Sequence, residues 1–393
     1  PAGFEPDGAL SAASLESRVS PSWKATTSGG STGVPKLIVA GRTGALDPGA
    51  MMRPFRMRRG QVQLVPGPLY HNAPFMTAMG GTFLGQHLVV LPKFDAQAAL
   101  EAITQHQVNY VGLVPTMMLR ILRILDTRPG AYDLSSLETV FHTAAPCPPW
   151  LKERWIDIVG ADRLYEGYGG TEGQAFTIIS GADWLTHRGS VGRPVAGEIT
   201  VIGPDKKPVA PAVVGEVVMR RSSGSPPGYR YIGAEARVYD GGWESLGDLG
   251  WFDEDGYLYL ADRVTDMLLV GGANVYPAEV EAAILEHPAV LSCAVVGLPD
   301  DDLGQLVHAV VQVDGTQREG LTDVSLRDFV EQRLVRYKVP RSFRFVTRPL
   351  RDDAGKIRRS TVRDREIRLR RPGTDSAPEL TAPRNRPRVA SGE

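Results

Sequence analysis

The chain has 393 residues, enough for a large core and more than one domain. A hydrophobic content of 42% and a charged content of 23% are ordinary for a globular protein, and the net charge of −1 provides no field that would attract nucleic acid. No apolar run approaches the roughly 20 residues that span a bilayer. We therefore expect a globular protein with neither a nucleic-acid partner nor a membrane span.

The cysteine pattern and the first residues bear on the compartment. Cys147 and Cys293 form no CxxC pair, which indicates neither a zinc site nor a disulfide framework and fits a reducing compartment. The first residues show no basic segment followed by an apolar one, so they do not resemble a signal peptide. The sequence predicts a cytoplasmic protein.

Strand-like and helix-like segments alternate from residue 23 onward, after a polar, serine-rich stretch at 1–22 that we expect to be a linker. Apolar runs predict strands, and apolar positions at helical spacing predict helices. The strands are expected at 61–67, 87–94, 108–115 and 137–146, and the helices at 95–107 and 116–125. This alternation predicts a large α/β domain, residues 23–264, built on a parallel sheet.

The pattern changes at about residue 190. From there to residue 262, short alternating strands separated by Gly-Pro and Asp-Lys turns predict a small, mostly antiparallel, barrel-like β subdomain. Residues 265–365 predict a second, small α/β domain. Its helices are expected at 277–290 and 325–337, and its strands at 291–299 and 307–314. The segment 366–393 is rich in Arg, Pro and Ser without apolar periodicity, so we expect a disordered tail.

A glycine-rich segment, TTSGGSTGVPK at residues 26–36, carries the first chemical signal. Consecutive glycines let the backbone approach a ligand closely, successive N–H groups can form an anion-binding nest, and a lysine adds positive charge. The segment suits a polyphosphate, although it lacks the Gly-Lys-Ser/Thr ending of a Walker A loop. The candidate phosphate-binding residues are Thr27, Ser28, Gly29, Gly30, Ser31, Thr32, Gly33 and Lys36.

Two alternatives for this segment stay open. A flexible Gly/Ser linker is one, although Pro35 and Lys36 leading into the apolar run LIVA fit it poorly. The segment also matches GxSxG, the nucleophile elbow of α/β-hydrolases, with Ser31 as nucleophile and His142 or His308 as a partner. The elbow requires a helix directly after the serine, whereas the β-branched residues that follow favour a strand.

The segment TSGGSTGVPK closely resembles the phosphate loop of the adenylate-forming superfamily, which includes acyl- and aryl-CoA synthetases, peptide-synthetase adenylation domains and firefly luciferase. Further motifs of that family follow in the same order. EGYGGTE at 166–172 resembles its YGxTE motif, which implies that Thr171 contacts phosphate and that Glu172 binds Mg²⁺, for which a carboxylate is a suitable hard ligand. The resemblance also implies an adenine slot formed by Ala144, Ala145, Pro146, Glu166, Gly167, Tyr168 and Gly169.

Two segments near the domain boundary complete the implied nucleotide site. WESLGDLG resembles the family's TGD segment, so Asp248 corresponds to the carboxylate that holds both ribose hydroxyls, with Leu246 where the family usually has threonine. ADRVTD resembles the hinge segment, in which Arg263 contacts ribose and phosphate. Thr265 occupies the hinge position, where Asp or Lys is usual. Without the resemblance, Asp248 would be an ordinary turn residue.

Three further segments concern the acid and its acceptor. GGANVYP resembles the glycine-rich loop that lines the pantetheine tunnel of CoA ligases, which implies that Gly271 and Gly272 let the thiol arm slide past bare backbone. DAGKI resembles the C-terminal motif whose lysine, here Lys356, is required for adenylation. PLYHNAPF resembles an aromatic-histidine stretch in the acyl pocket, where His71 would shape or gate the pocket; a packed loop histidine is the alternative. The absence of aspartate from residues 68–75 argues against an α-amino acid substrate.

Taken together, the resemblance implies an AMP-forming acid–CoA ligase that uses ATP, Mg²⁺ and CoA. A carboxylate would attack the α-phosphorus of ATP to give an acyl-adenylate and pyrophosphate, and the CoA thiol would then displace AMP. HTAAPCPPWLKERW is most similar to the bile-acid-CoA-ligase-like branch, which implies a fatty, steroid side-chain or aromatic acid as the small-molecule substrate. Two other hypotheses stay open: loading of a carrier-protein thiol, and a catalytically impaired nucleotide-binding fragment.

Family members usually carry a much longer segment before the phosphate loop than residues 1–26 provide. A variety with a shortened N-terminal region, a fragment, and a second polypeptide that supplies the missing part are the three explanations that the sequence leaves open. It leaves a homodimer open as well.

Overall fold

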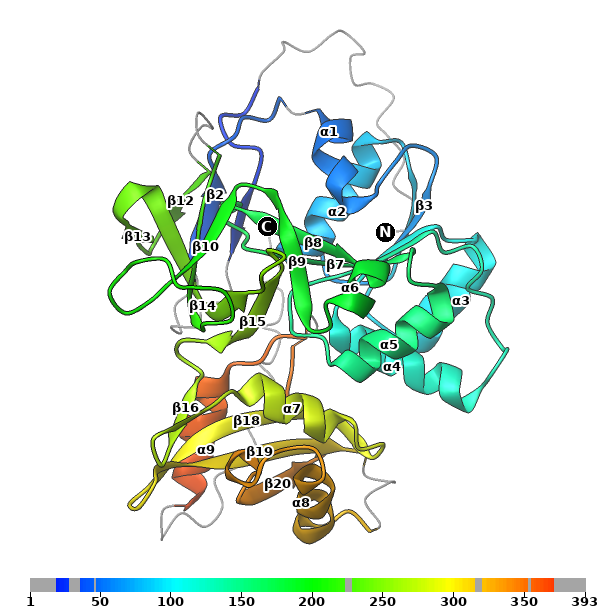
Figure 1. The fold of residues 1–393 in the computed structure, drawn as a ribbon. Helices are drawn as coiled ribbons and strands as arrows, with labels where there is room; N and C mark the ends of the chain where they lie inside the picture. Colours follow the sequence, from blue (N-terminus) through cyan, green and yellow to red (C-terminus); the bar gives the residue numbers. More distant parts are fainter. Residues whose placement is uncertain are drawn as a thin grey trace, which may run out of the picture.

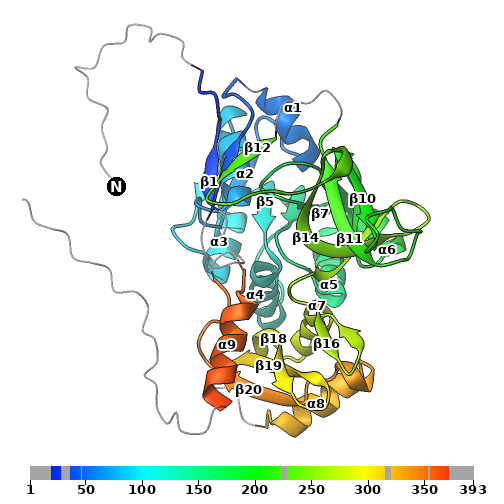
Figure 2. The same ribbon diagram turned by 90° about the vertical axis from the view of Figure 1, so that its left-hand side faces the viewer.

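The computed structural model describes residues 19–27, 36–45, 47–222, 228–314, 320–352 and 355–370. These residues form a large domain and, from β16 (Leu268–Val270) onward, a small domain. The small domain lies beside α4 (Pro115–Thr127) and α5 (Pro149–Val159) of the large one (Figures 1 and 2). None of the helices within the described residues is long and apolar enough to cross a membrane.

The large domain is built on the predicted parallel sheet. Its parallel strands lie in the order β4-β3-β5-β6-β7, and each connection crosses over through a helix, as parallel strands require. The strands are β3 (Val62–Val65), β4 (His87–Val90), β5 (Tyr110–Leu113), β6 (Thr139–His142) and β7 (Leu164–Gly169). The crossing helices are α2 (Asn72–Phe83), α3 (Ala96–His106), α4 and α5. The predicted α/β class is confirmed.

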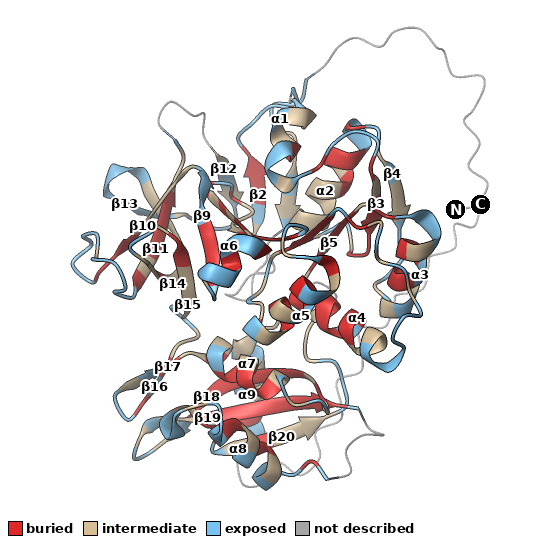
Figure 3. Cartoon of the chain, turned by 45° about the vertical axis from the view of Figure 1, so that its right-hand side comes forward, coloured by how far each residue is buried: buried red, intermediate tan, exposed pale blue. Residues whose placement is uncertain are grey.

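Local chemistry explains where these helices begin and end. The Asp95 carboxylate accepts the Ala98 N–H as the N-cap of α3, and the helix ends at Gln107, which has a left-handed φ of 49°. α4 begins at Pro115, whose fixed φ suits a first helical position. The apolar sides of both helices are buried against the sheet, with Met118 and Ile121 fully buried (Figure 3).

Antiparallel strands extend this sheet at the β7 edge. β7 pairs with β8 (Phe176–Ser180), which leads through β9 (Ser190–Ala196) into the predicted β subdomain. The subdomain is therefore continuous with the large sheet, and every pairing within it is antiparallel, as expected. Its other strands are β10 (Glu198–Ile202), β11 (Gly215–Arg220), β13 (Arg237–Tyr239), β14 (Trp243–Phe252) and β15 (Leu258–Arg263); the short helices α1 (Pro48–Met52) and α6 (Gly181–Thr186) complete the large domain.

A separate three-stranded sheet carries the two ends of the glycine-rich segment. β1 (Ala25–Thr27) and β2 (Leu37–Ala40) form an antiparallel hairpin, and β12 (Tyr229–Ile232) pairs with β2. Residues 28–35 themselves lie outside the described residues. The strand β2 follows the segment where the nucleophile elbow requires a helix, so the hydrolase alternative is wrong.

The small domain packs helices against a three-stranded sheet. β18 (Val290–Asp300) and β19 (Gly304–Val313) are antiparallel, and β20 (Ser342–Val346) joins β19 in parallel. The remaining elements are β16, β17 (Ala273–Val275), α7 (Pro277–Leu285), α8 (Asp323–Glu331) and α9 (Arg359–Arg370). Its apolar core is separate from that of the large domain.

Two expectations for the small domain need correction. α8 ends at Glu331, not at residue 337, because residues 336–338 form a separate 3₁₀ turn. The disordered tail was expected from residue 366, but α9 continues to Arg370 and Glu366 is only 3% exposed. The Glu366 carboxylate pairs with Arg344 of β20, so an ion pair rather than an apolar stripe anchors this part of the helix.

Candidate nucleotide-binding site

Three predicted residues meet where β7 ends and β14 and β15 run side by side. Asp248 and Arg263 are register partners across β14 and β15, and the Arg263 Nε lies 3.4 Å from Asp248 Oδ1. The Tyr168 hydroxyl donates to Asp248 Oδ2 at 2.8 Å. Burial, together with the negative charge of Asp248, raises the pKa of Tyr168 well above its usual range, so the phenol stays a donor. The carboxylate is thereby held in one orientation, as an acceptor for a vicinal diol requires.

Glycines are needed along the end of β7 because other groups fill the space of a side chain. A Cβ at Gly167 would lie 2.6 Å from Phe141, and one at Gly170 would lie 2.7 Å from both Leu246 and the Glu172 carboxylate. Such contacts are shorter than packed atoms tolerate. Leu246 stands where the family usually has threonine, and here it packs against this turn.

The loop after β6 lies against the same strand. The Thr143 hydroxyl donates to the Gly167 carbonyl at 2.7 Å, which brings Ala144, Ala145 and Pro146 beside β7. Ala144 has a φ of 76°, a left-handed conformation that is costly for a residue with a Cβ. The adenine-slot candidates of this loop and of β7 are thus neighbours, and Thr143, which was not among the predicted site residues, connects them.

Glu166 is held elsewhere. Its Oε2 accepts from the ammonium of Lys152, a residue of α5, at 2.6 Å. Both side chains are buried. His142 lies close by, with Nδ1 at 4.0 Å from Glu166, and burial lowers the pKa of this histidine to about 4. The structure therefore places the Glu166 side chain in an internal ion pair rather than with Tyr168 and Asp248.

The predicted metal ligand Glu172 lies beside Lys36 and Tyr231 of β12. It is 8% exposed, accepts a hydrogen bond from the Tyr231 hydroxyl at 2.6 Å, and has the Lys36 ammonium 3.7 Å from its Oε1. Thr171 is half-buried directly before it. Thr27 and Lys36 flank residues 28–35, which include the other predicted phosphate-binding residues and lie outside the described residues. A buried carboxylate beside an ammonium is a donor set that suits a divalent cation and phosphates.

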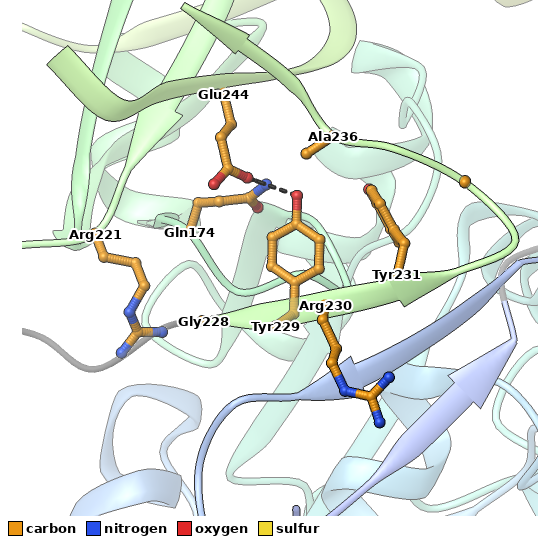
Figure 4. Close-up of a pocket in the computed structure, with 9 residues that line it drawn as sticks. Gln174, Arg221, Gly228, Tyr229, Arg230, Tyr231, Ala236 and Glu244 are labelled. Carbon is orange, nitrogen blue, oxygen red and sulfur yellow. Dashed lines mark hydrogen bonds between the residues drawn. The ribbon is translucent and has the colours of Figure 1, made fainter.

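Tyr231 is one of the residues that line a pocket of about 220 Å³ (Figure 4). At its wall, Glu244 Oε2 accepts from the Tyr229 hydroxyl at 2.6 Å and from the Gln174 amide at 2.8 Å. Arg221 also lines the pocket. Sequence reasoning missed Tyr229 and Tyr231, since β12 reaches the site only by pairing with β2.

The predicted acyl-pocket residue His71 is the N-cap of α2, and its ring lies 4.5 Å from that of Tyr70. Lys24, before β1, donates to Asn72 in the first turn of α2, and Trp23 stacks on Phe75 with ring centroids 6.4 Å apart. Burial lowers the pKa of Lys24 to about 8. Two residues from outside the predicted stretch PLYHNAPF, Trp23 and Lys24, therefore pack against the start of α2.

Lys356 belongs to a turn that abuts the large domain. Its N–H donates to Asp352 Oδ1 at 2.8 Å, and the preceding Gly355 has a φ of 72°. A Cβ on Gly355 would lie 2.6 Å from the hydroxyl of Thr116, in the first turn of α4 at the carboxyl end of β5. The ligand sites of parallel sheets lie at this end. The Lys356 side chain is exposed.

Gly271 and Gly272 form the turn between β16 and β17, with φ values of 55° and 83°. The Gly271 N–H donates at 2.9 Å to the carbonyl of Leu303, which also belongs to the small domain. Both glycines are exposed. Among the described contacts, the turn of Lys356 rather than the glycine turn therefore approaches the large domain.

Comparisons with known proteins agree with this geometry. A family model described as AMP-binding enzyme matches residues 26–229, and one described as AMP-binding enzyme C-terminal domain matches residues 279–356. The chain belongs to the AMP-binding enzyme family, so the expected relationship is confirmed.

The chain is 36% identical to a feruloyl-CoA synthase from Amycolatopsis over 309 residues, which are 77% of this chain and 61% of that protein. It is 31% identical to a 2-succinylbenzoate–CoA ligase from Bacillus cereus over 85% of this chain and 68% of the relative. A structure of o-succinylbenzoate CoA synthetase from Bacillus subtilis with its acyl-adenylate intermediate superposes with a TM-score of 0.71 at 26% identity, covering 86% of this chain and 68% of that one. The chain thus spans about three fifths of the length of the feruloyl-CoA synthase that it matches.

Proposed function

We propose that this protein activates a carboxylic acid with ATP and transfers the acyl group to the thiol of CoA. The observation that carries the proposal is the convergence of Tyr168, Asp248 and Arg263 at the end of β7, with Glu172 and Lys36 nearby. The names of the relatives, feruloyl-CoA synthase and 2-succinylbenzoate–CoA ligase, support the same reaction.

The residues would divide the binding of ATP among them. Asp248 accepts the two ribose hydroxyls, and Arg263, whose Nε lies 3.4 Å from Asp248 Oδ1, orients this carboxylate. The loop after β6 and Tyr168 border the adenine. Lys36 and the backbone of the glycine-rich segment hold the phosphates.

Glu172 would hold Mg²⁺, which neutralises phosphate charge when bound, and Thr171 would contact phosphate. Glu172 fits this role because it is a buried carboxylate that faces the lysine of the phosphate loop. One of its oxygens, Oε1, already accepts from Tyr231, which fixes the direction of the carboxylate.

In the first step a carboxylate oxygen of the acid attacks the α-phosphorus, and the bond to pyrophosphate breaks. Lys356 would draw the carboxylate and the α-phosphate together by its charge, since positioning and electrostatic stabilisation provide most of the catalysis in such displacements. Contact of the Gly355 turn with Thr116 supports an arrangement suited to this step.

In the second step the CoA sulfur attacks the carbonyl carbon, and AMP leaves with the bonding electrons of the acyl–oxygen bond. We propose that the small domain first rotates about Thr265, withdrawing Lys356 and bringing Gly271 and Gly272 to the site, as a hinge movement. The exposed position of the glycine turn is consistent with a second arrangement of this kind.

The substrate is proposed to be an apolar carboxylic acid, with aromatic acids ahead of fatty and steroid side-chain acids. The stacked Trp23 and Phe75 beside His71 suit a flat apolar group, and the two relatives are named for aromatic acids.

The experiment is a screen of aromatic, fatty and steroid side-chain acids for acid-dependent ATP–pyrophosphate exchange, followed by thioester formation with CoA or with a carrier protein. Exchange with an aromatic acid and a CoA thioester is the expected result. Thioester formation on the carrier protein alone would support the carrier-loading alternative. ATP binding without exchange for any acid would contradict the proposed reaction and favour a nucleotide-binding fragment.

A further inference from the structure

One face of the three-stranded sheet converges on Glu172. Thr26 of β1 is opposite Ile38 of β2, and Ile38 is opposite Tyr231 of β12. Cross-strand partners project from the same face of a sheet, so these side chains point the same way. Ile38 is 1% exposed, which identifies this face as the inner one. The sheet thus directs Tyr231 into the protein, toward Glu172.

Tyr231 contacts two groups that the proposed function uses. Its hydroxyl donates to Glu172 Oε1 at 2.6 Å, and the Lys36 ammonium lies 3.7 Å from the centre of its ring. The ammonium is also 3.7 Å from Glu172 Oε1, farther than a direct hydrogen bond. The three groups form one cluster, in which the ammonium lies over the face of the ring and the hydroxyl reaches the same carboxylate oxygen.

This arrangement keeps the two charges from forming a tight pair. An ammonium is attracted to the face of an aromatic ring, and a phenol donates to one carboxylate oxygen while the other stays available. Without the phenol and the ring, Lys36 would be free to close onto Glu172 and occupy the carboxylate. In such a tight pair, Glu172 would be less available to Mg²⁺ and Lys36 would be less available to phosphate.

We propose that Tyr231 is a positioning residue that holds Glu172 and Lys36 apart and oriented for Mg²⁺ and the phosphates of ATP. The proposal rests on the proposed function for the identity of the ligand. Tyr231 itself contacts neither the acid nor the reacting phosphorus in this scheme, so its effect falls on binding of the metal–nucleotide complex.

Tyr229 offers a matched control. It lies two residues earlier on the same strand and face, its ring is 4.8 Å from that of Tyr231, and its hydroxyl donates to Glu244 at the same distance of 2.6 Å. Glu244 is not among the predicted ligands, and it keeps a second donor in Gln174. Removing the Tyr229 hydroxyl therefore deletes an equivalent hydrogen bond outside the proposed metal site.

The test is calorimetric titration of ATP into the wild type and the variants over a range of Mg²⁺ concentrations and in EDTA. For Tyr231→Phe we expect the Mg²⁺ concentration that gives half-maximal enhancement of ATP affinity to rise about 10-fold, as loss of a hydrogen bond to a charged group predicts. Tyr231→Leu, which also removes the ring, should raise it further. Tyr229→Phe should match the wild type over the Mg²⁺ series and in EDTA.

Equal Mg²⁺ dependence for Tyr231→Phe and the wild type would overturn the proposal, as would an equal change in Tyr229→Phe. Tyr231→Phe keeps the ring and its packing, and an unchanged urea midpoint will show that it folds. A wild-type affinity for ATP that ignores Mg²⁺ would also overturn it, because Glu172 would then hold no metal. Binding as predicted without acid-dependent pyrophosphate exchange would uphold the role of Tyr231 and contradict only the proposed reaction.

Discussion

Replacing Lys152 by methionine tests whether the ion pair between Lys152 and Glu166 of β7 stabilises the folded protein. The Lys152 ammonium and Glu166 Oε2 are 2.6 Å apart, with side-chain exposures of only 1% and 9%. Water cannot replace the lost partner, so the carboxylate is left buried and unpaired, which costs about 3–5 kcal/mol. The double variant Lys152→Met/Glu166→Gln should recover part of this loss because it also removes the charge.

Arg154 provides the control on the same helix. Its ion pair with Asp126 has side chains that are each 51% exposed, and pairs of this kind contribute at most about 1 kcal/mol. The assay is equilibrium urea unfolding of Lys152→Met, Arg154→Met and the double variant. A loss of less than about 1 kcal/mol for Lys152→Met, or equal losses for the two single variants, would refute the assignment of Glu166 to an internal pair.

Three further results are expected. Asp248→Asn should weaken ATP binding about 10-fold in calorimetric titration, because a charged acceptor for two hydroxyls is lost. Gly355→Ala should reduce pyrophosphate exchange more than it reduces CoA-dependent use of preformed acyl-adenylate, since the added methyl would clash with Thr116. His142 should destabilise the protein in acid: burial lowers its folded pKa from the usual 6.5 to about 4, so its contribution is complete above pH 6.5 and is lost as the pH falls through 4. The loss amounts to about 3 kcal/mol in urea titrations, and His142→Gln should remove this part of the pH dependence.

The sequence predicted the parallel sheet well because its elements carry a local signal. In α4 the apolar residues recur at helical spacing, and a proline marks its start. α9 carries no such signal: its residues from Arg359 to Arg370 are mostly charged, and what anchors its end is the pairing of Glu366 with Arg344. A contact between distant segments is not visible in periodicity, so the predicted tail began too early.

The same distinction applies to the site. Asp248 and Arg263 were found through motifs, and strand register makes them neighbours. Tyr231 and Lys24 lie in no motif, and they reach the site only because β12 and β1 both pair with β2. Glu166 was included because it adjoins a motif, whereas its partner Lys152 comes from a helix that only the fold brings to it.

The central claim is that this chain forms an acyl-adenylate and that Lys356 serves this step. Its most direct test is acid-dependent ATP–pyrophosphate exchange by the wild type and Lys356→Ala, with Arg358→Ala, another exposed cation of the same segment, as the control. We predict exchange in the wild type and the control, and a loss of about 100-fold or more in Lys356→Ala, as expected when an oriented charge is removed from a reacting centre. Undiminished exchange in Lys356→Ala would contradict the account.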